Sequence, residues 1–106
     1  MDNISITNGN RSKRDKIHVS VTKKHIEMGI RGSFDHCPVA LAVKDALPGE
    51  YIIALITFLQ IGRTQINCSN YITLWIRSFD QGNPMHPFKF TIDLGAKSAY
   101  LGPNPF

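Results

Sequence analysis

Residues 22–47, with the sequence TKKHIEMGIRGSFDHCPVALAVKDAL, constrain the fold most, because they place two helix-forming segments on either side of a glycine-containing loop. Thr22 is a suitable N-cap for the first helix, since its hydroxyl oxygen can accept a hydrogen bond from an unpaired N–H of the first turn. This helix is expected to continue to Met28, and Gly29 is expected to end it in the left-handed conformation. A helix of barely two turns is unstable alone, so it must pack on the rest of the domain.

A second helix is expected from about Cys37 to Leu47. Pro38 suits its first turn, where the missing N–H has no partner within a helix. Asp35 or Cys37 can act as the N-cap, and Pro48–Gly49 ends the helix. The three alanines in this segment allow the helix to lie close to a sheet.

The rest of the chain predicts strands and one further helix. Alternating or β-branched segments predict strands at 16–22, about 51–57, about 59–67 and 87–93, and helical spacing predicts a helix at about 70–81. The strand at 51–57 is apolar on both faces, which favours a central place in the sheet. The order β-α-α-β-β-α-β indicates an α+β fold, with a four-stranded antiparallel or mixed sheet and helices mainly on one face.

A chain of 106 residues fits one domain, which we expect at residues 16–94. Residues 1–15 are polar, basic and without periodicity, which is typical of a disordered tail, and residues 95–106 are expected to form an irregular tail. The longest apolar run, Tyr51–Ile56, is too short to cross a bilayer, and the N-terminus lacks the apolar segment of a secretory signal. We therefore expect a cytoplasmic protein with no membrane partner.

The charge of the chain is uneven. The formal net charge is +4, and seven of the twelve Lys and Arg residues lie in the first 31 positions. A basic N-terminal third can attract phosphate or an acidic partner, or it can simply keep the protein soluble. A small nucleic-acid-binding regulator that uses Lys13, Arg14, Lys16 and the Lys23–Lys24 pair is therefore an alternative hypothesis.

Three segments together resemble a known family: the strand KIHVSVT at 16–22, HIEMGIRGSFDHCPVALAVKDAL at 25–47 and WIRSFDQGNPMHPFKFTI at 75–92. They are similar to small uncharacterised proteins of bacteriophages, prophages and actinobacterial genomes, whose pattern is roughly HI..G.RG....CP.ALA followed by FI..FD.G....PF.F. The match covers about two-thirds of the chain. The resemblance implies an origin in phage or mobile DNA and an accessory role, and it supplies no active site. Trp75 and the basic N-terminal extension depart from the pattern.

Cys37 has three interpretations. A thiol at a helix N-terminus beside His36 could be a nucleophile, because the helix dipole favours its thiolate. It could also bind a metal with His25, His36 or His86, although this spacing matches no familiar set of ligands. The simplest interpretation is structural, since Cys followed by Pro gives a compact helix start, and we expect neither a catalytic residue, nor a metal, nor a cofactor.

The preferred site is a binding site on the loop before the second helix. Basic side chains, a flexible glycine and an aromatic ring could together hold a phosphate and a base, although neither a Walker motif nor a G-x-G-x-x-G sequence is present. The candidate ligand-binding residues are Lys23, Lys24, His25, Arg31, Gly32, Phe34 and His36. An alternative for Arg31 is an ion pair with Asp35 or Asp80.

These observations predict a non-enzymatic, homo-oligomeric binding protein. With the phage resemblance, they suggest a counter-defence factor of the host cell cytoplasm. It would sequester a nucleotide immune signal or block a host defence protein by direct contact.

Overall fold

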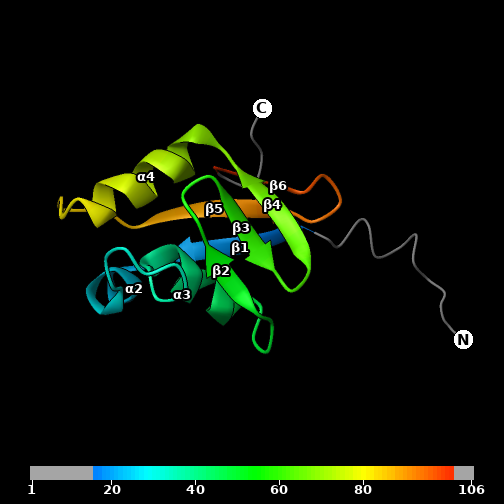
Figure 1. Cartoon of the computed structure of the whole chain (residues 1–106), viewed down its shortest axis with the longest axis horizontal. Coiled ribbons are helices and arrows are strands. Elements are labelled where there is room, and N and C mark those ends of the chain that lie inside the picture. Colours follow the sequence, from blue (N-terminus) through cyan, green and yellow to red (C-terminus); the bar gives the residue numbers. More distant parts are fainter. Residues whose placement is uncertain (1–15, 102–106) are drawn as a thin grey trace, which may run out of the picture.

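The computed structural model describes residues 16–101, which form an α+β fold of six strands and three helices. Figure 1 shows these elements, which in chain order are β1 (Lys16–Val21), α2 (Lys23–Met28), α3 (Pro38–Ala46), β2 (Ile52–Ala54), β3 (Phe58–Ile61), β4 (Thr64–Cys68), α4 (Asn70–Asp80), β5 (Phe88–Asp93) and β6 (Ser98–Leu101). None of these helices is long and apolar enough to cross a membrane.

All six strands belong to one mixed sheet with the order β1-β5-β6-β4-β3-β2. The pairs are antiparallel except β4–β6, where Asn67 and Cys68 lie parallel to Ser98 and Ala99. β1 and β2 are therefore the two edges of the sheet. Their positions matter, because both edges lie next to the helices that carry the candidate site.

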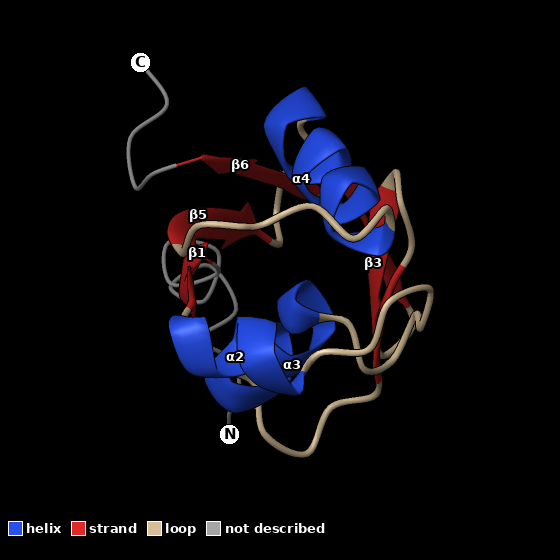
Figure 2. Ribbon diagram, turned by 90° about the vertical axis from the view of Figure 1, so that its left-hand side faces the viewer, coloured by secondary structure: helices blue, strands red, loops and turns tan. Residues whose placement is uncertain are grey.

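The sheet is curled, and α3 lies between its two edges. α3 contacts both β1 and β2, although these strands are at opposite ends of the strand order. Figure 2 shows β1 and β5 on one side, β3 on the other, and α2 and α3 across the gap between them. Five of the nine α3 residues are buried, which is expected for a helix enclosed on several sides: Pro38, Val39, Ala40, Ala42 and Val43.

α4 closes the opposite side of the core, where it packs on β4 and β6. The Trp75 ring lies 4.9 Å from the Phe88 ring, and Phe88 lies 5.7 Å from Phe90 and 5.5 Å from Tyr71, measured between centroids. The Trp75 indole N–H donates to the His86 carbonyl at 3.1 Å, so this buried ring has its polar atom satisfied.

The α+β class, the three helices and the first strand agree with the sequence-based expectation. Thr22 caps α2, Cys37 caps α3, and Gly82 follows α4 with a φ of 88°. The prediction of four strands is wrong, because the sheet has six. The expected strand at 59–67 is two strands joined by a tight turn at Gly62, whose φ of 58° suits the left-handed region.

Two further expectations about strands are also wrong. Ser98–Leu101, within the segment expected to be an irregular tail, form β6 and pair with both β5 and β4. The strand expected at 51–57 is only the three residues of β2, and it is an edge rather than a central strand. Its apolar residues are covered by α3 and by the loop before α3 instead of by strands on both sides. The tail predicted at residues 1–15 lies outside the described residues.

Gly29 ends α2 in a different way from the one expected. Its φ of −68° and ψ of 151° are extended, not left-handed. A side chain is excluded here by contact, because a Cβ at Gly29 would lie 2.6 Å from the ring carbons of Pro38. The glycine therefore permits the chain leaving α2 to pass directly against the start of α3.

Candidate functional site

The loop between α2 and α3 is held by its own backbone. The Ile30 N–H donates to the His36 carbonyl at 2.8 Å, and the Cys37 N–H donates to the Ser33 carbonyl at 3.1 Å. The Ser33 hydroxyl oxygen also accepts the His36 N–H at 3.1 Å. These bonds close the loop into a compact turn at the start of α3.

The loop is also bonded to two distant elements. The Gly32 N–H donates to the Asp80 carboxylate at 2.9 Å, which ties the loop to the end of α4. The Ala54 N–H of β2 donates to the Phe34 carbonyl at 2.7 Å, so the loop satisfies a backbone group on the open edge of the sheet. The loop therefore fills the corner between α3, α4 and β2.

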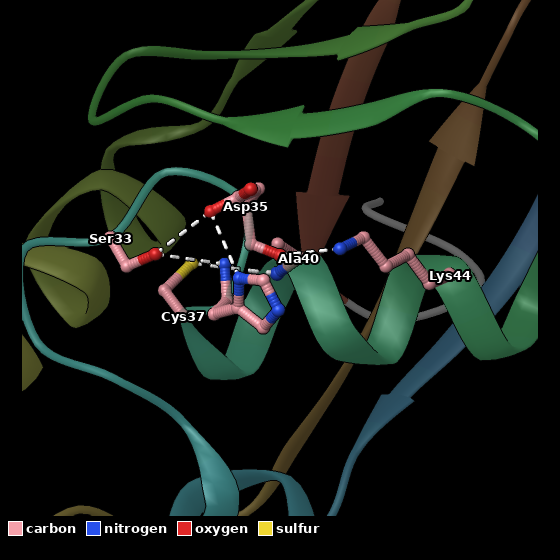
Figure 3. Close-up of polar contacts among 6 residues, drawn as sticks. Ser33, Asp35, Cys37, Ala40 and Lys44 are labelled. Atoms are coloured by element: carbon pink, nitrogen blue, oxygen red, sulfur yellow. Dashed lines mark hydrogen bonds and ion pairs between the residues drawn. The ribbon is translucent and has the colours of Figure 1, made fainter.

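Asp35 provides the negative charge at the start of α3, as Figure 3 shows. Its carboxylate accepts the Ser33 hydroxyl at 2.9 Å and lies 3.0 Å from His36 Nδ1. These hydrogen bonds, first from His36 and then from Ser33, hold the pKa of Asp35 below its ordinary value. The Lys44 ammonium donates to the Asp35 carbonyl, so α3 helps to fix the loop.

Cys37 has the environment of a structural cysteine. Its side chain is 2% exposed, and its sulfur accepts the Ala40 N–H at 3.5 Å. Burial raises the pKa of the Cys37 thiol, and it raises that of Cys68 to about 12. Both thiols are thus protonated at neutral pH, which is the opposite of an activated nucleophile. Within residues 16–101, no group of three or more His, Cys, Asp or Glu side chains is arranged to hold a metal ion.

A small hollow of about 170 Å³, which we call the loop pocket, lies beside Cys37. Its inner wall is apolar and comes from α3, β2 and α4, and its rim carries the Asp80 carboxylate. The lining residues are Gly32, Ser33, Phe34, Cys37, Ala54, Leu55, Ile56, Ile76 and Asp80. Three of these apolar side chains are exposed to solvent: Phe34 (51%), Leu55 (38%) and Ile56 (39%). Of these lining residues, only Gly32 and Phe34 belong to the ligand-binding set predicted from the sequence.

His25, a second candidate, fixes α2 rather than facing the loop pocket. Its Nδ1 accepts the Thr22 N–H at 2.9 Å, and its Nε2 lies 2.6 Å from the Asp45 carboxylate of α3. Because Nδ1 accepts, the proton is assigned to Nε2, which donates to Asp45. His25 therefore completes a capping box and joins the two helices. The second role could not be predicted from the sequence, because its partner Asp45 lies 20 residues away.

The structure distributes the predicted site residues over three hollows. Gly32 and Phe34 line the loop pocket. The helix hollow, of about 300 Å³, is lined by Lys24, His25, Met28, Leu41, Lys44 and Asp45. The strand-end hollow, of about 370 Å³, is lined by Ser20, Val21, Thr22, Lys23, Pro87, Phe88 and Lys89. Among the described residues, these three hollows thus separate Lys23, the Lys24–His25 pair and the Gly32–Phe34 pair from one another.

Arg31 lies over the turn that follows α4. A Cβ placed on Gly82 would be 3.0 Å from the Arg31 guanidinium. In the described part of the chain, Arg31 forms no ion pair with Asp35 or Asp80. His36 lines none of these three hollows, and its Nδ1 lies 3.0 Å from the Asp35 carboxylate.

Three residues of the loop pocket that matter for its chemistry were not predicted from the sequence as site residues. Leu55 and Ile56 lie in an apolar run that looked like the interior of a strand, but β2 ends at Ala54 and leaves them exposed. Asp80 was expected to form an ion pair rather than to line a site. The Asp80 carboxylate accepts the Gly32 N–H from 48 residues away, and no nearby residue in the sequence indicates this bond. Lys13 and Arg14 of the alternative nucleic-acid hypothesis lie outside the described residues.

The chain matches no protein-family model, no curated protein sequence and no solved structure.

Proposed function

We propose that the chain is a non-enzymatic binding protein that contacts a partner protein through the loop pocket. The observation that supports this most is the cluster of Phe34, Leu55 and Ile56, which are exposed together around one apolar hollow. Apolar side chains gathered at a polar rim are typical of a surface that another protein covers. The partner would insert one apolar side chain between them.

The size and charge of the pocket favour a side chain over a nucleotide. Pockets for small molecules usually measure about 300–1,000 Å³, whereas the loop pocket measures about 170 Å³. Of the described residues that line it, none is basic, and the one charged group is the Asp80 carboxylate. A phosphate placed here would face a like charge. The sequence suggested either sequestration of a nucleotide or direct contact with a protein, and the loop pocket supports direct contact better.

The surroundings of the loop pocket support binding rather than catalysis. The Cys37 thiol has a raised pKa, and the nearest carboxylate, Asp80, accepts a backbone N–H of the loop. The pocket thus offers no activated nucleophile and no pair of acid and base groups. Its polar atoms position the loop.

The wider role rests on the family resemblance. We propose a phage-derived accessory protein that acts in the host cytoplasm as a counter-defence factor and blocks a host protein. Assembly into a homo-oligomer would present the loop pocket more than once, which raises apparent affinity for a multimeric partner. Native mass spectrometry of the purified chain measures the oligomeric state directly.

The test compares two exposed apolar positions. The chain is expressed in bacteria, bound proteins are identified by mass spectrometry, and the affinity of each purified partner is measured by calorimetry. Ile56→Asp places a charge at the loop pocket, whereas Leu74→Asp places one on the exposed face of α4, where Leu74 is 60% exposed. We expect Ile56→Asp to weaken binding at least tenfold, because this loss corresponds to about 1.4 kcal/mol and burying an unpaired carboxylate in an apolar contact costs more. Equal loss in both variants, or loss only in Leu74→Asp, would show that another surface binds. Circular dichroism confirms that both variants fold.

A further inference from the structure

The strand-end hollow lies where the β1–β5 pair opens. Val21 and Phe88 form the last pair of the ladder, after which β1 turns into α2 and the chain before β5 leaves in another direction. The hollow of about 370 Å³ lies between the two diverging segments. Its volume is within the range of sites for small organic molecules.

The walls of this hollow combine an apolar surface with positive charge. Pro87 is exposed and supplies apolar surface, whereas Val21 and Phe88 are only 1% and 9% exposed, with Phe88 held in place by three neighbouring rings. Lys23 and Lys89 supply two ammonium groups, and both side chains are exposed. Of the described residues that line the hollow, none is acidic. An anionic group would therefore meet positive charge from two elements without a competing carboxylate.

The Ser20 hydroxyl adds a directional contact for a bound anion. Ser20 lies opposite Lys89 in the β1–β5 register, so these two side chains project on the same face of the sheet. A phosphate near Lys89 can thus also accept a hydrogen bond from Ser20. A few polar groups on an otherwise apolar wall are the usual composition of a specific small-molecule site.

We infer that the strand-end hollow binds a small organic anion with a flat ring system, of the size and charge of a mononucleotide. The phosphate lies between Lys23 and Lys89, and the ring packs on the exposed Pro87. This site is separate from the loop pocket, so the inference does not depend on the proposed contact with a protein. It also differs from the nucleotide site expected from the sequence, because it shares only Lys23 with that set.

The experiment uses the full chain and adenosine monophosphate as the probe. Amide resonances are recorded by two-dimensional NMR during titration with adenosine monophosphate, adenosine and inorganic phosphate in separate series. We expect the monophosphate to shift the amides of residues 20–23 and 88–89, and adenosine to bind at least tenfold more weakly. Lys23→Gln and Lys89→Gln should each weaken the monophosphate about tenfold, the size expected for loss of one charge-assisted hydrogen bond.

Lys24→Gln is the matched control, because Lys24 is adjacent on α2 but lines the helix hollow. It should leave the affinity for the monophosphate within twofold, as should Ile56→Asp. The inference is overturned if Lys24→Gln weakens binding as much as Lys23→Gln, which would indicate general attraction to a basic surface. Equal shifts with inorganic phosphate alone, or no shifts at millimolar monophosphate, would also overturn it.

Discussion

Replacing Gly29 with alanine tests the close contact between α2 and α3. The φ and ψ of Gly29, −68° and 151°, are allowed for alanine, so the change introduces no backbone strain. The added methyl group would lie 2.6 Å from Pro38 Cδ and Cγ and 2.9 Å from Pro38 N. Ordinary contact begins at 3.4 Å, and the proline ring cannot rotate away because it is part of the backbone of α3.

The expected cost of Gly29→Ala comes from two opposing effects. Overpacking of this kind destabilises a protein by about 1–3 kcal/mol. Loss of glycine freedom in the unfolded chain favours folding by about 0.4–1 kcal/mol. We therefore expect a net loss of about 1–2 kcal/mol in the free energy of unfolding. In urea, this corresponds to a midpoint lower by about 1 M for a chain of this size.

Gly95→Ala is the matched control for this measurement. Gly95 also has a φ outside the left-handed region, and a Cβ there would lie in ordinary contact, 3.4 Å from the Asp93 carboxylate. Its free energy of unfolding should stay within about 0.5 kcal/mol of the parent or rise slightly. If Gly29→Ala were as stable as Gly95→Ala, the packing of Pro38 against Gly29 would be refuted.

Three further predictions concern Asp80, Cys68 and Asp35. Asp80→Ala should lower the free energy of unfolding by about 1 kcal/mol, because the Gly32 N–H loses its acceptor, and Asp80→Asn should restore part of this in urea denaturation. Burial raises the pKa of the Cys68 thiol from its ordinary value of 9.0 to about 12 in the folded chain. Stability should therefore fall as the pH rises above 9, and in pH-dependent denaturation Cys68→Ala should show a smaller fall. The carboxyl of Asp35 should titrate below 3.8 in NMR, and His36→Ala should move this pKa back toward 3.8; an unchanged value would contradict the bond to His36.

Local signals in the sequence were sufficient to predict where the helices begin and end. The hydroxyl of Thr22, the start of α3 at Cys37 and Pro38, and the glycine after α4 each act within a few residues of the helix end. Gly29 is the exception. A glycine after a helix usually indicates a left-handed end, but here the requirement comes from Pro38, which reaches it through the folded loop.

The sheet was harder to predict, because its pairings join distant segments. β6 is four residues long and obtains its hydrogen bonds from β5 and from a parallel pair with β4, and no periodicity in Ser98–Leu101 marks it. The turn at Gly62 falls inside the segment 59–67, which was expected to be a single strand. β2 was placed in the centre because it is apolar, but a helix and a loop cover it instead of strands.

The candidate site was predicted in part. The sequence identified the loop before α3, and Gly32 and Phe34 do line the loop pocket. It could not show that Leu55 and Ile56 face the same hollow, since only the pairing of Ala54 with the loop brings them there. Basic residues close together in sequence were grouped as one site, although Lys23 and Lys24 line different hollows.

Photo-crosslinking in cells tests the proposed contact at the loop pocket most directly. A benzophenone side chain is introduced at Phe34 in one variant and at Leu74 in another, both of which are exposed in the folded chain. Our account predicts that the variant at position 34 crosslinks to one host protein on irradiation and that Ile56→Asp abolishes this product. A product formed only at position 74, or one at position 34 that persists with Ile56→Asp, would contradict it.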